Sequence, residues 1–97
     1  MLPVVYLPRA AQYFKKLRDK HLKDKYKEAI SSIRENPRIG EAKSGDLSGI
    51  LSVDIFHAGQ NYELAYRVSQ LDSGEIVVII LAATRQDFYN ELKRYLK

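Results

Sequence analysis

The stretch IVVIILAA, residues 76–83, is the longest uncharged apolar run in the 97-residue chain and decides the fold class. Eight residues are far too few to span a bilayer. A continuous apolar run is typical of a central strand that is covered on both faces of its sheet. The tripeptide Asp72-Ser73-Gly74, just before the run, has the composition of a tight turn. We therefore expect residues 76–83 to form a central strand that follows a hairpin turn.

Two amphipathic strands are expected upstream of this run, because apolar and polar residues alternate there with a period of two. In the first, the alternating pairs are Leu51/Ser52, Val53/Asp54 and Ile55/Phe56. In the second, Tyr62, Leu64, Tyr66 and Val68 alternate with Glu63, Ala65 and Arg67. A turn is expected at 58–61 between the two strands. Residues 37–49 contain three glycines and no periodicity, which predicts a loop.

The N-terminal third predicts a short strand and two helices. Residues 4–7 are rich in β-branched and aromatic side chains, and Pro8 suits the first turn of a helix. Apolar residues then recur at helical spacing in two stripes, separated by a join at 19–21 and ended at Asn36 by Pro37. The stripes are Ala10, Tyr13, Phe14, Leu17 and then Leu22, Tyr26, Ala29, Ile30, Ile33. A last helix follows Thr84, which can cap it.

The resulting order is β-α-α-β-β-β-α, an α+β fold with a largely antiparallel sheet. An N-terminal helical hairpin and a C-terminal helix are expected to pack on the sheet. Residues 1–97 are expected to form a single domain in which all large apolar elements share one core.

Composition and charge limit the function classes. The chain has no cysteine, which excludes disulfides, zinc ribbons and thiol catalysis. The N-terminus lacks the basic region and long apolar region of a signal peptide, so a cytoplasmic protein with no membrane partner is expected. Residues 1–45 carry a net charge of +6 (eleven Lys/Arg, five Asp/Glu), and residues 46–97 carry −2 (five and seven). The basic half suits an acidic partner, nucleic acid or protein, although a solvated lysine-rich helix face has the same charge.

Three local patterns resemble the RelE/ParE superfamily of bacterial toxins, and the resemblance covers nearly the whole chain. The first is the Leu47-Ser48-Gly49 step before the second strand. The second is the tyrosine-bearing strand at 62–68. The third is the apolar strand that runs into Arg85 and is followed by Phe88-Tyr89. Each pattern is weak by itself, but their order and spacing in so short a chain are fairly specific.

The resemblance implies the toxin of a type II toxin–antitoxin system, neutralised by a cognate antitoxin protein. In one branch such toxins enter the ribosome and cut mRNA, which inhibits translation; in the ParE branch they inhibit DNA gyrase without established chemistry. We expect the first, a metal-independent mRNA endoribonuclease (an mRNA interferase). The alternatives are a gyrase inhibitor and a degenerate toxin that only binds its antitoxin. No cofactor is expected, and two isolated histidines do not make a metal site.

Cleavage of RNA through the 2′-hydroxyl needs a base, an acid and cations for the phosphorane charge. The resemblance points to Arg85 as the cation and to Tyr89 as a residue that stacks on a base or assists the leaving group. Glu41 lies at the offset, six residues before Leu47, of a glutamate proposed as general base in YoeB-like toxins. Structural roles remain open: Arg85 can pair with Asp87 or Glu63, Tyr89 can cover the core, and Glu41 can be a solvated loop residue.

Several further residues are candidates for substrate binding: Lys43, Arg67, His57 and Asp54. The chain also departs from the family, because Glu63 follows the strand tyrosine where relatives carry arginine, and Ser52 and Asp54 replace lysines. Carboxylates near a phosphate add repulsion. A consistent alternative makes Glu63 or Asp54 the base and Arg67 and Arg85 the cations. A structural Glu63–Arg67 ion pair is also possible, and a lone exposed histidine such as His57 usually has no catalytic role.

Overall fold

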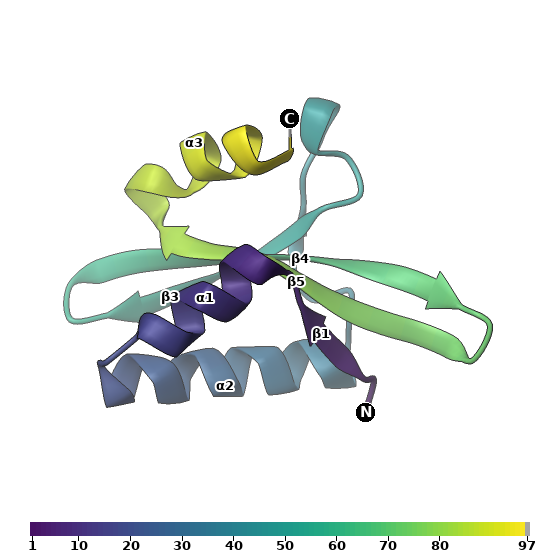
Figure 1. Cartoon of the computed structure of the whole chain (residues 1–97), viewed down its shortest axis with the longest axis horizontal. Helices are drawn as coiled ribbons and strands as arrows, with labels where there is room; N and C mark the ends of the chain where they lie inside the picture. The colour runs from purple at the N-terminus through teal and green to yellow at the C-terminus, as the bar shows by residue number, and fades with distance from the viewer. Residues whose placement is uncertain (97) are drawn as a thin grey trace.

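A five-stranded sheet in the order β1-β5-β4-β3-β2 forms the centre of the protein in a computed structural model that describes residues 1–96 (Figure 1). Strand β1 pairs parallel with β5, and the other neighbours pair antiparallel. The α+β class and the largely antiparallel sheet are therefore confirmed. The strands are β1 (Val4–Tyr6), β2 (Glu41–Ala42), β3 (Leu51–His57), β4 (Gln60–Leu71) and β5 (Gly74–Thr84).

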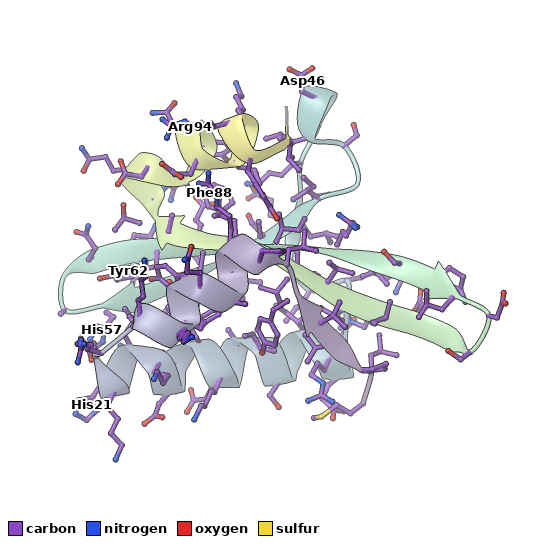
Figure 2. All side chains as sticks on the ribbon, viewed as in Figure 1. His21, Asp46, His57, Tyr62, Phe88 and Arg94 are labelled. Carbon is purple, nitrogen blue, oxygen red and sulfur yellow. The ribbon has the colours of Figure 1, made fainter. Side chains whose placement is uncertain are left out.

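Helices cover both faces of this sheet. Helices α1 (Pro8–Lys16) and α2 (Lys20–Glu35) lie on one face, and α3 (Arg85–Leu96) lies on the other (Figure 1). The buried residues accordingly form two clusters, and the expectation of one shared core was wrong. Cluster one includes Tyr26, Ile33, Leu64, Tyr66 and Ile79. Cluster two consists of Leu47, Ile50, Ala65, Ile80, Leu81, Phe88 and Leu92. Phe88 points from α3 toward the sheet (Figure 2).

The second helical layer changes the environment of the predicted polar strand face. Side chains that alternation assigns to solvent are buried beneath α3, among them Ser52 (4% exposed) and Glu63 (2% exposed). Strand β5 is covered on both faces as predicted, because Val77–Ala82 are all buried. A β-bulge shifts the register between Ala65/Leu81 and Tyr66/Ile79, which leaves Ile80 as an extra residue in β5. Both Ile80 and Leu81 consequently pack in cluster two, on the α3 side of the sheet.

The predicted loop at 37–49 contains two elements that the sequence did not indicate. Glu41 and Ala42 form β2, which pairs with Ser52 and Leu51 at the edge of the sheet, and a 3₁₀ turn, η1, covers Gly45–Leu47. A two-residue strand is too short to show periodicity, and its partner lies about ten residues away in sequence. The edge pairing fixes Glu41 against β3.

Tyr66, a residue of cluster one, anchors the segment that leads into β2. The buried Tyr66 hydroxyl donates to the Pro37 carbonyl (2.7 Å) and accepts from the Gly40 N–H (2.9 Å). A Cβ atom at Gly40 would lie 2.6 Å from the Tyr66 oxygen, so the close approach of this backbone requires glycine. The backbone of the segment that leads into β2 is thus fixed by a residue of cluster one.

Two predicted boundaries were also shifted. The join between the helices is 17–19, because Asp19 is the N-cap of α2 and accepts from the Leu22 N–H (3.1 Å). The β3–β4 turn is confined to Ala58-Gly59, and Gln60 and Asn61 already belong to β4. Within residues 1–96, no helix is long and apolar enough to cross a membrane.

Candidate active site

A small polar pocket of about 60 Å³ lies where β2, β3, β4 and α3 meet. Its lining brings together every residue that the sequence suggested as catalytic, together with Lys43, Asp54 and Ser52. The complete lining is Glu41, Lys43, Ser52, Asp54, Glu63, Arg85 and Tyr89. Ser52 was not selected as a site residue from the sequence. Its strand position offered the signal, since Ser52 and Asp54 are two residues apart and share a face of β3.

Glu63 forms the buried floor of this pocket. Its side chain is 3% exposed, with Oε1 3.6 Å from the Arg85 Nε and Oε2 3.9 Å from the Lys43 Nζ. Among the described residues, Oε2 has no hydrogen-bond partner. Burial raises the pKa of Glu63 above its ordinary value; Lys43 and Arg85 oppose this shift, and the Asp54 carboxylate, its cross-strand neighbour, adds to it. Glu63 is therefore a carboxyl group that takes up a proton more readily than a solvated one.

Lys43 connects the two sides of the pocket. Its side chain is 8% exposed, and the ammonium donates to Glu41 Oε1 (3.1 Å) and to the Tyr89 hydroxyl (2.9 Å). Burial opposes the charge on Lys43, but these hydrogen bonds and the Glu63 carboxylate outweigh it and raise the pKa of Lys43. The lysine is thus a charged donor placed against the Tyr89 phenol, and Glu41 orients it.

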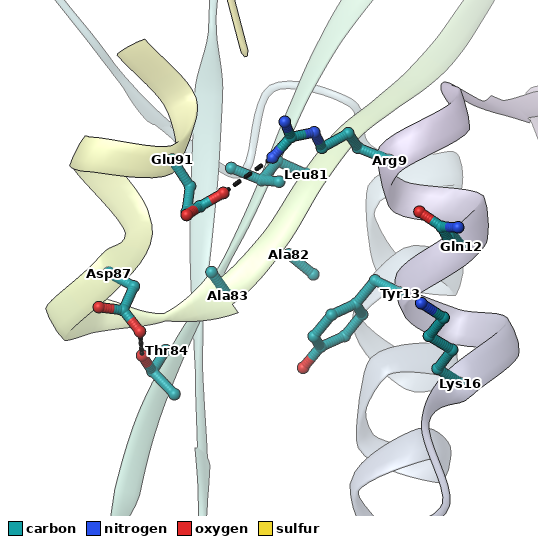
Figure 3. Close-up of a pocket in the computed structure, with 10 residues that line it drawn as sticks. All are labelled: Arg9, Gln12, Tyr13, Lys16, Leu81, Ala82, Ala83, Thr84, Asp87 and Glu91. Atoms are coloured by element: carbon teal, nitrogen blue, oxygen red, sulfur yellow. Dashed lines mark hydrogen bonds and ion pairs between the residues drawn. The ribbon is translucent and has the colours of Figure 1, made fainter. Parts of the chain in front are cut away.

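Arg85 begins α3 directly after β5 and stands at the mouth of the pocket. Its side chain is 61% exposed, and NH1 lies 3.9 Å from the Asp54 Oδ2. The expected alternative partner Asp87 does not pair with it, because Asp87 accepts from the Thr84 hydroxyl (3.3 Å), as Figure 3 shows. The exposed guanidinium keeps donors available to an incoming anion.

Two residues suggested for substrate binding lie outside the pocket. Arg67 has its Nε 3.4 Å from the Ser69 hydroxyl, and Glu63 pairs with Lys43 and Arg85 instead. His57 lies beside the first turn of α2 (Figure 2), where its Nε2 is 2.8 Å from the Asp19 Oδ2. The structure does not bring either residue to the other candidates. Within residues 1–96, no three His, Asp or Glu side chains are arranged to hold a metal ion.

Larger grooves occur on the surface, but their chemistry differs. One of about 380 Å³ lies between α1 and α3, with Leu81–Thr84 as its floor, and an Arg9–Glu91 ion pair (2.8 Å) crosses it (Figure 3). Another of about 450 Å³ lies between α1 and α2, with an aromatic and aliphatic lining and three lysines at its rim. The small polar pocket, and neither of these, contains the candidate acid–base residues.

Comparison with known families agrees with the fold. The model of the ParE-like toxins of type II bacterial toxin–antitoxin systems matches residues 4–93. The chain belongs to this family. The RelE/ParE resemblance seen in the sequence is therefore confirmed. A comparison with curated proteins found no significant match.

Solved structures share the fold at low sequence identity. A YoeB/ParE toxin from Agrobacterium tumefaciens is 20% identical with a TM-score of 0.72, over 87% of this chain and 99% of that one. The intact E. coli RelBE toxin–antitoxin complex contains a chain that is 22% identical with a TM-score of 0.68, over 86% and 95%. A double mutant of E. coli RelE in complex with an antitoxin RelBc peptide is 22% identical with a TM-score of 0.66, over 94% and 93%.

Proposed function

We propose that this toxin is a metal-independent, ribosome-dependent mRNA endoribonuclease that inhibits translation in the cytoplasm. The observation that supports this activity is the pocket itself. A buried carboxyl group with a raised pKa, two cations and a phenol line this cavity of about 60 Å³. These are the groups that 2′-hydroxyl attack on a phosphodiester requires.

In the proposed reaction, the Glu63 carboxylate takes the proton of the 2′-hydroxyl. The 2′-oxygen then bonds to the adjacent phosphorus as the bond from phosphorus to the 5′-oxygen breaks. The products are a 2′,3′-cyclic phosphate and a 5′-hydroxyl end. Tyr89 supplies the proton to the departing 5′-oxygen, and the Lys43 ammonium at 2.9 Å stabilises the phenolate that remains. Arg85, at the exposed mouth, binds the non-bridging phosphate oxygens.

The departure of Glu63 from the family's cationic pattern fits this scheme. Three carboxylates and two cations line the pocket, so its formal charge is −1 with Glu63 ionised and zero with Glu63 protonated. After it has taken the proton, Glu63 no longer repels the phosphorane. Proton transfer and charge neutralisation are then one event, which favours the transition state over the ground state.

Purified toxin in a reconstituted translation system tests this activity, with the 5′ ends of the message mapped. Wild-type toxin is expected to produce discrete cuts within codons. Glu63→Gln and Tyr89→Phe should each lower the cleavage rate about 10²–10⁴-fold, the usual contribution of one acid–base group. Arg67→Ala is the matched control, because this exposed arginine lies outside the pocket, and it should cut at the wild-type rate.

Intact messages, at doses that arrest growth in cells, would contradict the nuclease. A supercoiling assay with purified gyrase then examines the ParE-type alternative, which inhibition at micromolar toxin would support. Harmless expression in a bacterial host, with no antitoxin present, would instead indicate a degenerate toxin.

We also propose that a cognate antitoxin neutralises the toxin by laying an acidic, amphipathic segment over the α1–α2 groove. Toxin–antitoxin complexes are among the structural neighbours. The groove is lined by Tyr6, Phe14, Tyr26 and Ile30, with Lys15, Lys23 and Lys27 around it. Apolar side chains of such a segment fit the floor, and its carboxylates fit the lysines.

Co-expression of the toxin with its cognate antitoxin tests the proposed binding site. Replacing Lys15, Lys23 and Lys27 together by glutamate should abolish rescue and leave toxicity intact, whereas Lys93→Glu on α3 should be rescued like wild type. Full rescue of the triple variant would place the antitoxin elsewhere.

A further inference from the structure

Phe56 is the most exposed large hydrophobic side chain in residues 1–96, with 69% of its surface accessible. The preceding residue of β3, Ile55, is buried at 6% exposure and packs in cluster one, on the side of α1 and α2. The Phe56 ring points the other way and belongs to neither cluster. Among the described residues it stacks on no other aromatic ring. Its apolar surface is unused by the fold.

The register of the sheet places this ring beside the candidate active site. Asp54 pairs with Glu63 and Phe56 pairs with Asn61 across the antiparallel β3–β4 ladder, so all four side chains emerge on the α3 face. Phe56 lies two residues beyond Asp54, a distance of about 6.8 Å along the strand. Opposite the ring, the Oδ1 of Asn61 is buried, so the ring is the group of this pair that faces solvent. The exposed Phe56 ring thus continues the face that carries the pocket along the sheet.

The backbone that carries the ring is held in place. Lys25 from α2 donates to the Phe56 carbonyl (2.7 Å), and the neighbouring His57 pairs with Asp19 at 2.8 Å. Both contacts tie the end of the β3–β4 hairpin to α2. A ring that is exposed on a fixed backbone offers a binding surface without a large loss of conformational entropy on binding.

We propose that Phe56 is a stacking platform for the nucleobase next to the scissile phosphate of single-stranded RNA. The inference rests on the proposed nuclease activity and specifies where its substrate lies. With a phosphate at Arg85, the strand continues over the face that carries Phe56. Stacking on an aromatic face is open to every base. Phe56 is thus a positioning residue outside the acid–base machinery.

A tryptophan reporter tests the stacking directly, because the chain contains no tryptophan. Phe56→Trp places a single indole at the proposed platform. Leu71→Trp, at an exposed position (48%) by the β4–β5 turn at the opposite end of the sheet, is the control (Figure 1). The probes are a short 2′-O-methyl RNA, which cannot be cut, and ribose 5-phosphate, which has no base. Saturable quenching of the first variant alone, by the RNA alone, is expected.

Cleavage kinetics give a second measurement. Phe56→Ala should raise KM about 5- to 150-fold, the usual effect of losing one stacked base, with a smaller change in kcat. Phe56→Tyr should restore the wild-type KM, since it keeps the aromatic face. Circular dichroism of the exposed-site variants checks that each is folded.

The two proposals fail in different ways. If wild-type toxin cuts RNA and Phe56→Ala has the same KM and cut positions, the platform is refuted and the nuclease stands. If the Phe56→Trp signal is quenched by RNA but the wild-type toxin cuts none, the stacking of Phe56 on a nucleobase stands, and the nuclease is refuted together with the placement of that base beside a scissile phosphate. Equal quenching of both tryptophan variants, or none at millimolar RNA, refutes the platform.

Discussion

Replacing Glu63 by glutamine is expected to make the toxin more stable and less active. The carboxylate is 3% exposed and has an unpartnered oxygen, and burial raises its pKa above the ordinary value of 4.5. The folded state therefore favours the protonated form. The stability contributed by that proton is fully present below the unfolded pKa and is lost as the pH rises through the folded pKa. At neutral pH the ionised group is a net cost that glutamine removes.

The magnitude follows from opposing effects at the pocket floor. Burying a carboxylate costs several kcal/mol. The buried Lys43 at 3.9 Å offsets about 4 kcal/mol at an effective dielectric constant of about 20. Arg85 at 3.6 Å contributes about 1 kcal/mol or less, because its guanidinium is 61% exposed and screened by solvent, and the neighbouring Asp54 repels by a similar amount. The raised pKa shows that burial prevails. Glutamine does not leave Lys43 as an unpaired buried charge, because the ammonium keeps its hydrogen bonds to Glu41 and Tyr89. We therefore expect Glu63→Gln to stabilise by about 1 kcal/mol, the small difference between these opposing effects.

Thermal unfolding across pH measures this effect. About 1 kcal/mol corresponds to a rise in Tm of about 4–8 °C for a domain of this size. The rise should be present at about pH 8 and absent at about pH 4, where both states of the wild type are protonated. A Glu63→Gln variant that is less stable than wild type at pH 8, by a deficit that shrinks on acidification, would refute the reasoning. It would show that the Lys43 and Arg85 pairs outweigh burial.

Glu75→Gln is the matched control with the opposite sign. The hydrogen bond from Arg38 holds the pKa of Glu75 below its ordinary value. Its stabilising contribution is present above the unfolded pKa and is lost as the pH falls through the folded pKa. This variant should therefore be less stable than wild type near neutral pH and equal to it in acid.

Tyr66→Phe should lower the free energy of unfolding by about 1–3 kcal/mol, because it leaves the Pro37 carbonyl and the Gly40 N–H without their partner. The midpoint of urea unfolding measures this loss. An unchanged midpoint would show that water replaces the hydroxyl. Gly40→Ala should destabilise by about 1–3 kcal/mol, and Tyr66→Phe in the same chain should not relieve it, since the ring carbon Cε1 is also only 2.9 Å from the added methyl. Ile33→Ala and Leu92→Ala should each lower the free energy of unfolding by about 2–5 kcal/mol. The two losses should add, because the residues lie in different clusters. A double variant whose loss differs from the sum by more than about 0.5 kcal/mol would show that the clusters are coupled through the sheet.

The sequence predicted the strands well because their patterns are local. The apolar run in β5 and the alternation in β3 are visible in any window of eight residues. It could not predict that Glu63 is buried, because alternation identifies two strand faces and does not show that α3 covers the second. Nor could it predict β2, whose two residues become a strand only by pairing with β3.

The site residues also differ in whether local sequence could predict their position. Arg85 and Tyr89 occupy consecutive turns of one helix, so their proximity follows from helical geometry. Glu41 lies on the edge strand β2 and Lys43 directly follows it. The spacing of the family resemblance indicated Glu41, whereas Lys43 was a candidate only as a nearby cation. Arg67 was grouped with Arg85 by charge alone, and its place on β4 sets it apart. Charge indicates which side chains can bind a phosphate, and tertiary pairing determines where they lie.

The anchoring of the β2 segment by Tyr66 has a consequence for genetics. A selection for cells that survive expression of this toxin collects mutations that disarm it. Because one hydroxyl from the far side of the sheet positions the strand that carries Glu41 and leads into Lys43, such a selection is not limited to residues that line the pocket. Substitutions at Gly40 and Tyr66 belong among the survivors, although neither residue touches the substrate in the proposed reaction. A map of survivors would therefore show a line of sensitive positions running through the sheet, from the pocket to the layer of α1 and α2.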